Sequence, residues 1–155
     1  MRKFVVSIIV VSIMFLAAAG LNAAPAQNNA AGKWFTNLEK AQSAAKAAKK
    51  PILLVISGSD WCPPCKMLER NILSQNAFRT DAAKRIILLH ADFPRERKQS
   101  AEEKSDARKI AAKYQAEGVP TVYLLSPEGV VLDKKVGYIN VKPEKYLDLF
   151  KGMGK

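Results

Sequence analysis

Apolar and polar residues along the chain form blocks that predict helices and strands in turn. A first helix is predicted after the capping-box sequence Thr36–Glu39, with apolar residues at helical spacing, and it should stop before Pro51. The unbroken apolar run 52–56 predicts a strand that is covered on both faces. A second helix should start at the cysteines and run through residue 72, and a short helical segment should follow near residues 77–78.

The second half of the chain continues the same alternation. Residues 86–89 predict another buried strand, and the charged stretch 93–99 predicts a surface loop. A second capping box, Ser100–Glu103, opens a helix with an apolar face. The remaining predicted elements are a strand over 121–125, a turn over 126–129, a returning strand over 130–136, and a helix from Pro143 with Tyr146, Leu149 and Phe150 facing inward. Strands separated by helices, followed by a hairpin, predict one α/β domain with a mixed sheet.

The first 26 residues have the three-part layout of a secretory signal peptide. Met1-Arg2-Lys3 is positive, residues 4–21 are mostly apolar, and Ala24-Pro25-Ala26 fits a cleavage site. We therefore expect residues 1–26 to be removed, 27–33 to form a flexible leader, and 34–151 to form the folded domain. The alternative is a chain that stays anchored in the membrane through residues 4–21, whose apolar run approaches the length of a spanning helix.

The net charge of +11 is spread over the chain rather than gathered in one stripe. Acidic residues are interleaved with the basic ones, and no aromatic residues accompany them in the manner of a nucleic-acid-binding surface. We expect a soluble, lysine-rich surface with no nucleic-acid partner and, at most, weak attraction to a membrane surface.

The chain contains two cysteines, in the sequence Trp61-Cys62-Pro63-Pro64-Cys65-Lys66. An intramolecular disulfide can therefore join only Cys62 to Cys65. A C-x-x-C pair at the start of a helix is typical of a redox site, because the spacing brings the sulfurs about one turn apart. A structural disulfide is the alternative, although so short a loop would add little stability. A metal site is not expected, because a closed zinc site needs four ligands and His90 is the one histidine.

These residues together resemble the thioredoxin superfamily. The resemblance extends from about residue 34 to residue 151 and rests on the C-x-x-C sequence, on Gly118-Val119-Pro120-Thr121 before a strand, and on Gly137 before the last helix. Glu69 and the segment Asn76-Ala77-Phe78 are similar to the periplasmic branch related to the C-terminal domain of the membrane thiol:disulfide interchange reductase. The resemblance implies a thioredoxin fold, with a central mixed sheet of about four strands flanked by helices.

The resemblance also implies how the site is built. Val119-Pro120 should be a cis peptide bond lying against the disulfide, with the Val119 backbone free to pair with a substrate strand. Cys62 should be the exposed nucleophile and Cys65 the more buried resolving thiol. The surface that meets a substrate would then consist of Trp61, Pro63, Pro64, Val119 and Pro120.

Other residues near the cysteines are candidates for tuning their chemistry. Members of the superfamily often carry a buried aspartate six residues before the first cysteine, where this chain has Ile56. Asp60, Glu69 or water would then have to accept the proton of Cys65, and Lys66 could influence the charge of the thiolate. The absence of a histidine between the cysteines argues mildly against a strong oxidant.

We therefore expect an exported thiol–disulfide oxidoreductase that exchanges disulfides with protein substrates, in the reductase or isomerase direction. Its partners would be protein thiols and disulfides together with a redox partner such as a membrane reductase, and it would need no cofactor. A bacterial periplasm is the expected compartment, with secretion or membrane anchoring as alternatives. The competing hypothesis is a thioredoxin-fold binding module whose disulfide is inert.

Overall fold

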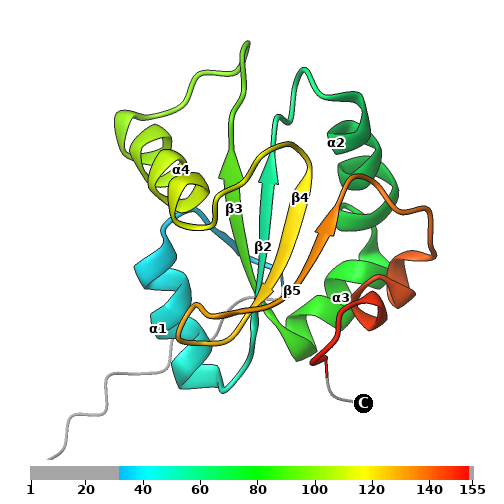
Figure 1. Cartoon of the computed structure of the whole chain (residues 1–155). Coiled ribbons are helices and arrows are strands. Elements are labelled where there is room, and N and C mark those ends of the chain that lie inside the picture. Colours follow the sequence, from blue (N-terminus) through cyan, green and yellow to red (C-terminus); the bar gives the residue numbers. More distant parts are fainter. Residues whose placement is uncertain (1–31, 154–155) are drawn as a thin grey trace, which may run out of the picture.

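A five-stranded mixed sheet forms the centre of the fold (Figure 1). The structure is a computed structural model that describes residues 32–153. The strands, β1 (Trp34–Phe35), β2 (Ile52–Ser57), β3 (Ile87–Asp92), β4 (Thr121–Leu125) and β5 (Val131–Val136), lie in the order β1-β3-β2-β4-β5. β3 runs parallel to β1 and β2, whereas β4 runs antiparallel to β2 and β5. The predicted α/β thioredoxin fold is confirmed, with one strand more than expected.

Helices cover both faces of the sheet. The helical elements are α1 (Leu38–Ala48), α2 (Pro63–Leu68), the π-helical turn η1 (Glu69–Leu73), α3 (Asn76–Arg85), α4 (Ala101–Lys113) and the 3₁₀ turns η2 (Pro143–Lys145) and η3 (Leu147–Leu149). α1 and α4 lie on one face of the sheet, and α2, α3 and the C-terminal turns lie on the other (Figure 1). The fold is therefore a three-layer sandwich with an apolar core on each side of the sheet.

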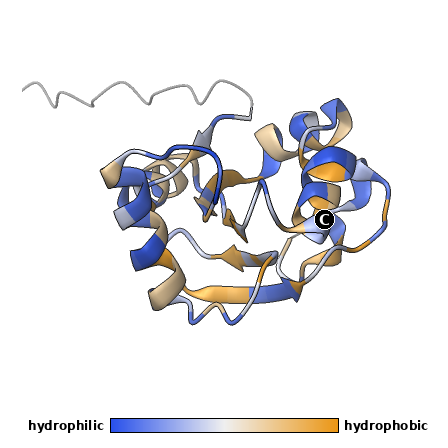
Figure 2. Cartoon of the chain, turned by 90° about the horizontal axis from the view of Figure 1, so that it is seen from above, coloured by the Kyte–Doolittle hydropathy of each residue, from blue (hydrophilic) through white to orange (hydrophobic). Residues whose placement is uncertain are grey.

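β2 is the central strand, and all six of its residues are buried. Successive side chains of a strand point to opposite faces, so Leu53 and Val55 pack in the core beneath α2 and α3, whereas Leu54 and Ile56 pack beneath α1 and α4. A strand covered on both faces has no polar side, which explains the unbroken apolar run in the sequence. Seen from above, apolar stretches lie on the sheet and the helices carry both polar and apolar residues (Figure 2).

Three local details differ from the sequence predictions. β1 was not predicted, because a two-residue strand is too short to show an alternating pattern. Asn37, not Thr36, caps α1, and its side chain accepts the Lys40 N–H at 3.0 Å. The C-terminal helix expected from Pro143 is instead two 3₁₀ turns that bury Tyr146, Leu147 and Phe150 and leave Leu149 only partly buried.

Other elements begin or end at residues different from those predicted. The helix expected to run from the cysteines through Ile72 ends at Leu68 and continues as the π-helical turn η1. The short segment expected near residues 77–78 is the full helix α3. The capping box at Ser100 and Glu103 is present as predicted. β3 extends to Asp92 rather than ending at Leu89, which carries two polar side chains to the end of the sheet that also holds the cysteines.

The predicted signal peptide (1–26), the alternative anchor (4–21) and most of the predicted leader (27–33) lie outside the described residues. Within residues 32–153, no helix combines the length and the apolar character needed to cross a membrane.

The packing beneath α3 generates a stability prediction. Phe78 is fully buried, and its ring contacts Tyr146 edge-on with the ring centroids 6.0 Å apart. Replacing Phe78 with Ala should lower the free energy of unfolding by about 3–5 kcal/mol, because the change removes buried apolar area and leaves a cavity. Urea denaturation would measure this loss. Val130→Ala, at a site that is 61% exposed, is the control and should change stability by less than about 0.5 kcal/mol. Equal stability of the two variants would show that Phe78 is not part of the core.

Candidate active site

The two cysteines lie at the start of α2, after the loop that leaves β2. They are joined as a disulfide, with Cα atoms 5.2 Å apart. Cys62 is the N-cap of α2, and its sulfur accepts the Cys65 backbone N–H at 3.3 Å. Pro63 and Pro64 occupy the first positions of the helix, where an N–H would have no helical partner. The residues between the cysteines therefore start the helix without a loss of hydrogen bonds.

Both cysteines are buried in the disulfide form, each with 3% of its surface exposed. The expectation that Cys62 is exposed and Cys65 more deeply buried does not hold for this form. The physical reason lies in the neighbouring loop, since the Cys62 sulfur lies 3.7 Å from the Val119 carbonyl oxygen. Pro63 is exposed, and Trp61, Pro64 and Val119 are half-buried around the pair.

The Val119–Pro120 peptide bond is cis, the isomer that the resemblance implied. Pro120 is buried immediately before β4, and its carbonyl accepts the Gly137 N–H at 2.9 Å. The Thr121 hydroxyl donates to the Gly118 carbonyl at 2.7 Å and closes the turn on its other side. These contacts place the Val119 carbonyl over the Cys62 sulfur. The roles in substrate binding assigned above to the residues around the disulfide stay predictions.

Trp61 is fixed between two segments of chain. Its indole N–H donates to the Phe93 carbonyl at 2.7 Å, and the Arg95 guanidinium lies over its ring, 4.0 Å from the centroid. Gly58 lies against the indole, so a Cβ atom at this position would overlap the ring. The absence of a side chain at Gly58 therefore allows Trp61 to pack next to Cys62.

Asp60 holds the loop that follows β3. Its carboxylate accepts the backbone N–H groups of Arg95, Glu96 and Arg97 at 2.8–3.1 Å. These hydrogen bonds, with the one from Arg95 contributing most, lower the pKa of Asp60 to about 2. A carboxyl group with this pKa stays ionised at neutral pH, and its oxygens face the loop. Asp60 is therefore suited to fixing the loop and poorly suited to accepting the proton of Cys65.

The other two tuning candidates lie on the helical segment after the cysteines. Lys66 is exposed on α2. Glu69 is also exposed, accepts a hydrogen bond from the Ser74 hydroxyl at 2.6 Å, and lines a cavity of about 310 Å³ that Cys65 also lines. Of the two, Glu69 is the one that the structure brings to the cavity beside Cys65.

The same cavity contains a polar cluster that the sequence reading did not identify as a unit. Ser57, at the end of β2, lies opposite Asp92, at the end of β3. Its hydroxyl contacts the His90 Nε2 atom at 2.7 Å and donates to the Asp92 carboxylate at 3.2 Å. Asp92 also accepts hydrogen bonds from the Ser59 N–H, the Ser59 hydroxyl and the Arg97 guanidinium at 2.6–3.0 Å.

The surroundings of His90 and Asp92 determine whether each side chain is charged. Burial lowers the pKa of His90, only partly opposed by the nearby Asp92 and Glu69 carboxylates, so the ring is neutral at pH 7. Burial alone would raise the pKa of Asp92, but the hydrogen bonds from Ser59 and Arg97 outweigh it and hold the pKa below its ordinary value. The cluster therefore contains a neutral imidazole beside an ionised carboxylate.

This geometry corrects the expectation that position 56, where related proteins often carry a buried aspartate, is the place for an acid beside Cys65. Ile56 belongs to the core beneath α1 and α4, on the face of the sheet opposite α2. Val55 and Ser57 are the residues of β2 that line the cavity beside Cys65, so Ser57 is the polar one, and the buried acid comes from the neighbouring strand as Asp92. The polar residues at alternate positions 90 and 92, after an apolar strand, were the available signal, but the pairing register with β2 is needed to interpret them.

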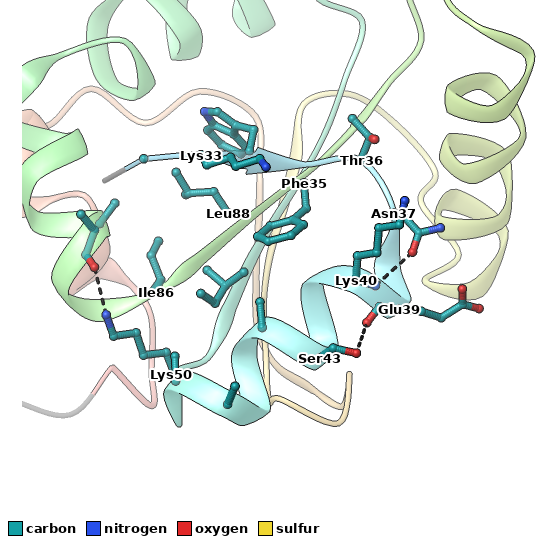
Figure 3. A pocket seen from close by; sticks show the side chains of 18 of the residues that line it. Lys33, Phe35, Thr36, Asn37, Glu39, Lys40, Ser43, Lys50, Ile86 and Leu88 are labelled. Carbon is teal, nitrogen blue, oxygen red and sulfur yellow. Dashed lines mark hydrogen bonds between the residues drawn. The ribbon is translucent and has the colours of Figure 1, made fainter. Parts of the chain in front are cut away.

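A larger hollow lies away from the cysteines. It has a volume of about 1160 Å³ and runs along β1 and α1, with Phe35, Lys40, Lys50 and Leu88 among its lining residues (Figure 3). The Lys50 ammonium is held at one end by the Ala83 carbonyl, 2.9 Å away. No cysteine lines this hollow, so its size does not bear on the disulfide chemistry.

Sequence comparisons connect these features with known proteins. A family model described as a thioredoxin-like domain matches residues 38–153, well over half of the chain. Disulfide bond reductase DsbH of Chlamydia pneumoniae is 31% identical over 85 residues, covering 55% of this chain and 51% of that protein. Thioredoxin-related protein DsbJ of the same organism is 23% identical over 116 residues, covering 75% of this chain and 33% of that protein. The chain thus spans about half of one relative's length and a third of the other's.

Solved structures share the fold. A structure of DsbH oxidoreductase superposes with a TM-score of 0.68 at 25% identity, covering 76% of this chain and 81% of that chain. The reduced C-terminal domain of Neisseria meningitidis DsbD gives a TM-score of 0.52 at 22% identity, covering 72% of this chain and 90% of that chain. At this identity, the second match shows similarity of fold alone.

The contacts of Asp60 generate a prediction about the loop. Asp60→Ala should speed hydrogen exchange at the amides of Arg95, Glu96 and Arg97, because their acceptor is lost. Asp60→Asn is the matched control and should show a smaller effect, since one side-chain oxygen remains. In the unchanged protein, the lowered pKa means that this protection is complete above the ordinary aspartate pKa of about 3.9 and is lost as the pH falls through about 2. Equal protection factors in all three proteins would contradict the role of Asp60.

Proposed function

Because the chain belongs to the thioredoxin-like domain family, we propose that it is a thiol–disulfide oxidoreductase that acts on protein substrates through Cys62 and Cys65. The observation that carries the proposal is the position of the disulfide. It lies at the start of α2, and its Cys62 sulfur lies 3.7 Å from the carbonyl that precedes cis-Pro120. A backbone carbonyl at this place can accept a hydrogen bond from an extended substrate segment and so align a substrate sulfur with Cys62.

The exchange proceeds in two balanced steps. In the dithiol form, the Cys62 thiolate attacks one sulfur of a substrate disulfide, a bond forms between Cys62 and that sulfur, and the other substrate sulfur leaves and takes a proton. Cys65 then loses its proton and attacks the Cys62 sulfur, which releases the second substrate thiol. The two protein thiols are oxidised to the Cys62–Cys65 disulfide, and the substrate disulfide is reduced to two thiols.

We favour the reductase or isomerase direction. Two prolines stand between the cysteines, so no imidazolium is available there to stabilise the Cys62 thiolate strongly. The relative DsbH is named a disulfide bond reductase. Known thiol–disulfide oxidoreductases have reduction potentials from about −270 to about −120 mV, a difference of roughly 7 kcal/mol. A measured reduction potential of the Cys62–Cys65 pair would therefore determine the direction.

The proposed site of action is a bacterial periplasm. The pattern of residues 1–26 supports export with cleavage, and retention through residues 4–21 or release from the cell are the alternatives. In that compartment the oxidised protein needs a redox partner that returns two electrons to the disulfide, and a membrane reductase would fill this role.

The second candidate is a binding module with an inert disulfide. The burial of both sulfurs in the disulfide form favours this reading, because an incoming thiol must reach a sulfur atom in order to react. The placement of Val119 and the small stabilisation expected from so short a disulfide loop favour exchange. The two candidates differ in whether Cys62 forms mixed disulfides.

A trapping experiment separates them. Cys65→Ala protein, mixed with a peptide disulfide of known sequence, should accumulate one peptide chain on Cys62, because the thiol that would release it is missing. Intact-mass spectrometry before and after dithiothreitol would measure the adduct. Cys62→Ala is the matched control and should form far less adduct. An absence of adduct on the Cys65→Ala protein would contradict exchange and favour the inert module.

A further inference from the structure

Cys65, the proposed resolving cysteine, and the imidazole of His90 line the same cavity of about 310 Å³. Its charged or titratable lining residues are Cys65 from α2, Glu69 from η1, His90 and Asp92 from β3, and Arg97 from the loop after β3. Trp34 of β1 adds an uncharged ring, whose centroid lies 5.6 Å from that of His90. Cys65 itself is 3% exposed, so the bulk solvent has little access to its sulfur.

The hydrogen bonds of the cluster assign the proton on His90. An ionised Asp92 only accepts hydrogen bonds, so the Ser57 hydroxyl donates to it. Ser57 then has only acceptor capacity left for the contact of 2.7 Å with His90, and the His90 Nε2 atom must carry the proton and donate. Nδ1 is therefore left as the basic nitrogen of the ring. Serine stands between histidine and aspartate in this chain of bonds, so it is not the nucleophile–base–acid order of a hydrolase triad.

We propose that His90 is the proton acceptor for Cys65 in the second step of exchange, held in its tautomer by Ser57 and Asp92. The proposal rests on the proposed function. The proton of the Cys65 thiol passes to Nδ1 of His90, directly or through water in the cavity, and gives a Cys65 thiolate and an imidazolium. The thiolate attacks the Cys62 sulfur, the bond from Cys62 to the substrate breaks, and the substrate sulfur leaves with the electron pair and takes a proton.

The other carboxylates are less suited to this task. The Asp92 carboxylate already accepts five hydrogen bonds, the fifth from the Phe93 N–H at 3.0 Å, and the carboxylate oxygens of Asp60 are bound to the loop after β3. Glu69 is exposed and hydrogen-bonded to Ser74. Asp92 and Glu69 instead act on His90, since both favour its protonated form, whereas Arg97 and burial oppose it. A neutral ring beside two carboxylates can take up a proton during the reaction and release it afterwards.

The single histidine makes a direct test feasible, because every imidazole signal in an NMR spectrum belongs to His90. We would follow its ring protons against pH in two matched variants, Cys62→Ala, which retains Cys65, and Cys65→Ala, which retains Cys62. The Cys62→Ala protein should show a second inflection at the pH where the Cys65 thiol titrates, and the Cys65→Ala protein should lack it. Identical titration curves in the two variants would overturn the proposal.

A kinetic measurement provides the second readout. Cys62 is first converted to its mixed disulfide with thionitrobenzoate, and the release of the coloured thiolate then reports the attack by Cys65 alone. His90→Gln should slow this release about tenfold or more at pH 7, with the first step changed less than about twofold. Release at an unchanged rate would overturn the proposal. If Cys62 fails to react at all, the proposed function fails, and the NMR comparison still decides whether His90 and Cys65 are coupled.

Discussion

The parallel pairing of β2 with β3 is the constraint on which the site depends. This register places Ser57 opposite Asp92 at the end of the two strands where the chain leaves β2 for the cysteines. The same pairing forms the middle of both apolar cores, since Leu53, Val55 and Leu88 lie on one face and Leu54, Ile56 and Leu89 on the other. A shift of one residue would exchange these faces and move the polar side chains away from α2. The same register of β2 and β3 is therefore required both to pack the cores and to place the polar cluster.

The loop after β3 connects that cluster with the surface beside Cys62. Asp60 accepts its backbone N–H groups, Arg95 covers the ring of Trp61, and Arg97 reaches back to Asp92. Each contact fixes the loop against a different part of the site. The Arg97–Asp92 pair differs from an ordinary surface ion pair because Asp92 is only 6% exposed, so the loop helps keep a buried carboxylate ionised. The environment of the disulfide thus depends on a segment that carries no cysteine.

Much of the fold was predictable because long elements leave strong patterns. The apolar run of β2, the capping box of α4 and the bounds of β4 all followed from the sequence, and the resemblance to the thioredoxin superfamily is confirmed by the family match to residues 38–153. The disulfide partners followed from having two cysteines in the chain. β1 and the C-terminal 3₁₀ turns could not be predicted from the sequence, because segments of two or three residues are too short to show periodic spacing of apolar residues. The cluster of Ser57, His90 and Asp92 could not be predicted from the sequence either. Its members come from two strands, and only the register of these strands brings them together.

The central claim is that Cys62 and Cys65 exchange disulfides with other proteins, and an equilibrium titration tests it most directly. The protein would be incubated in glutathione buffers of known potential, and the fraction of disulfide would be measured by thiol labelling and mass. Our account predicts rapid equilibration and a midpoint less negative than about −300 mV, within the range of exchanging proteins. A midpoint below about −300 mV, together with no measurable exchange with a small test disulfide, would show that the disulfide is inert and contradict the account.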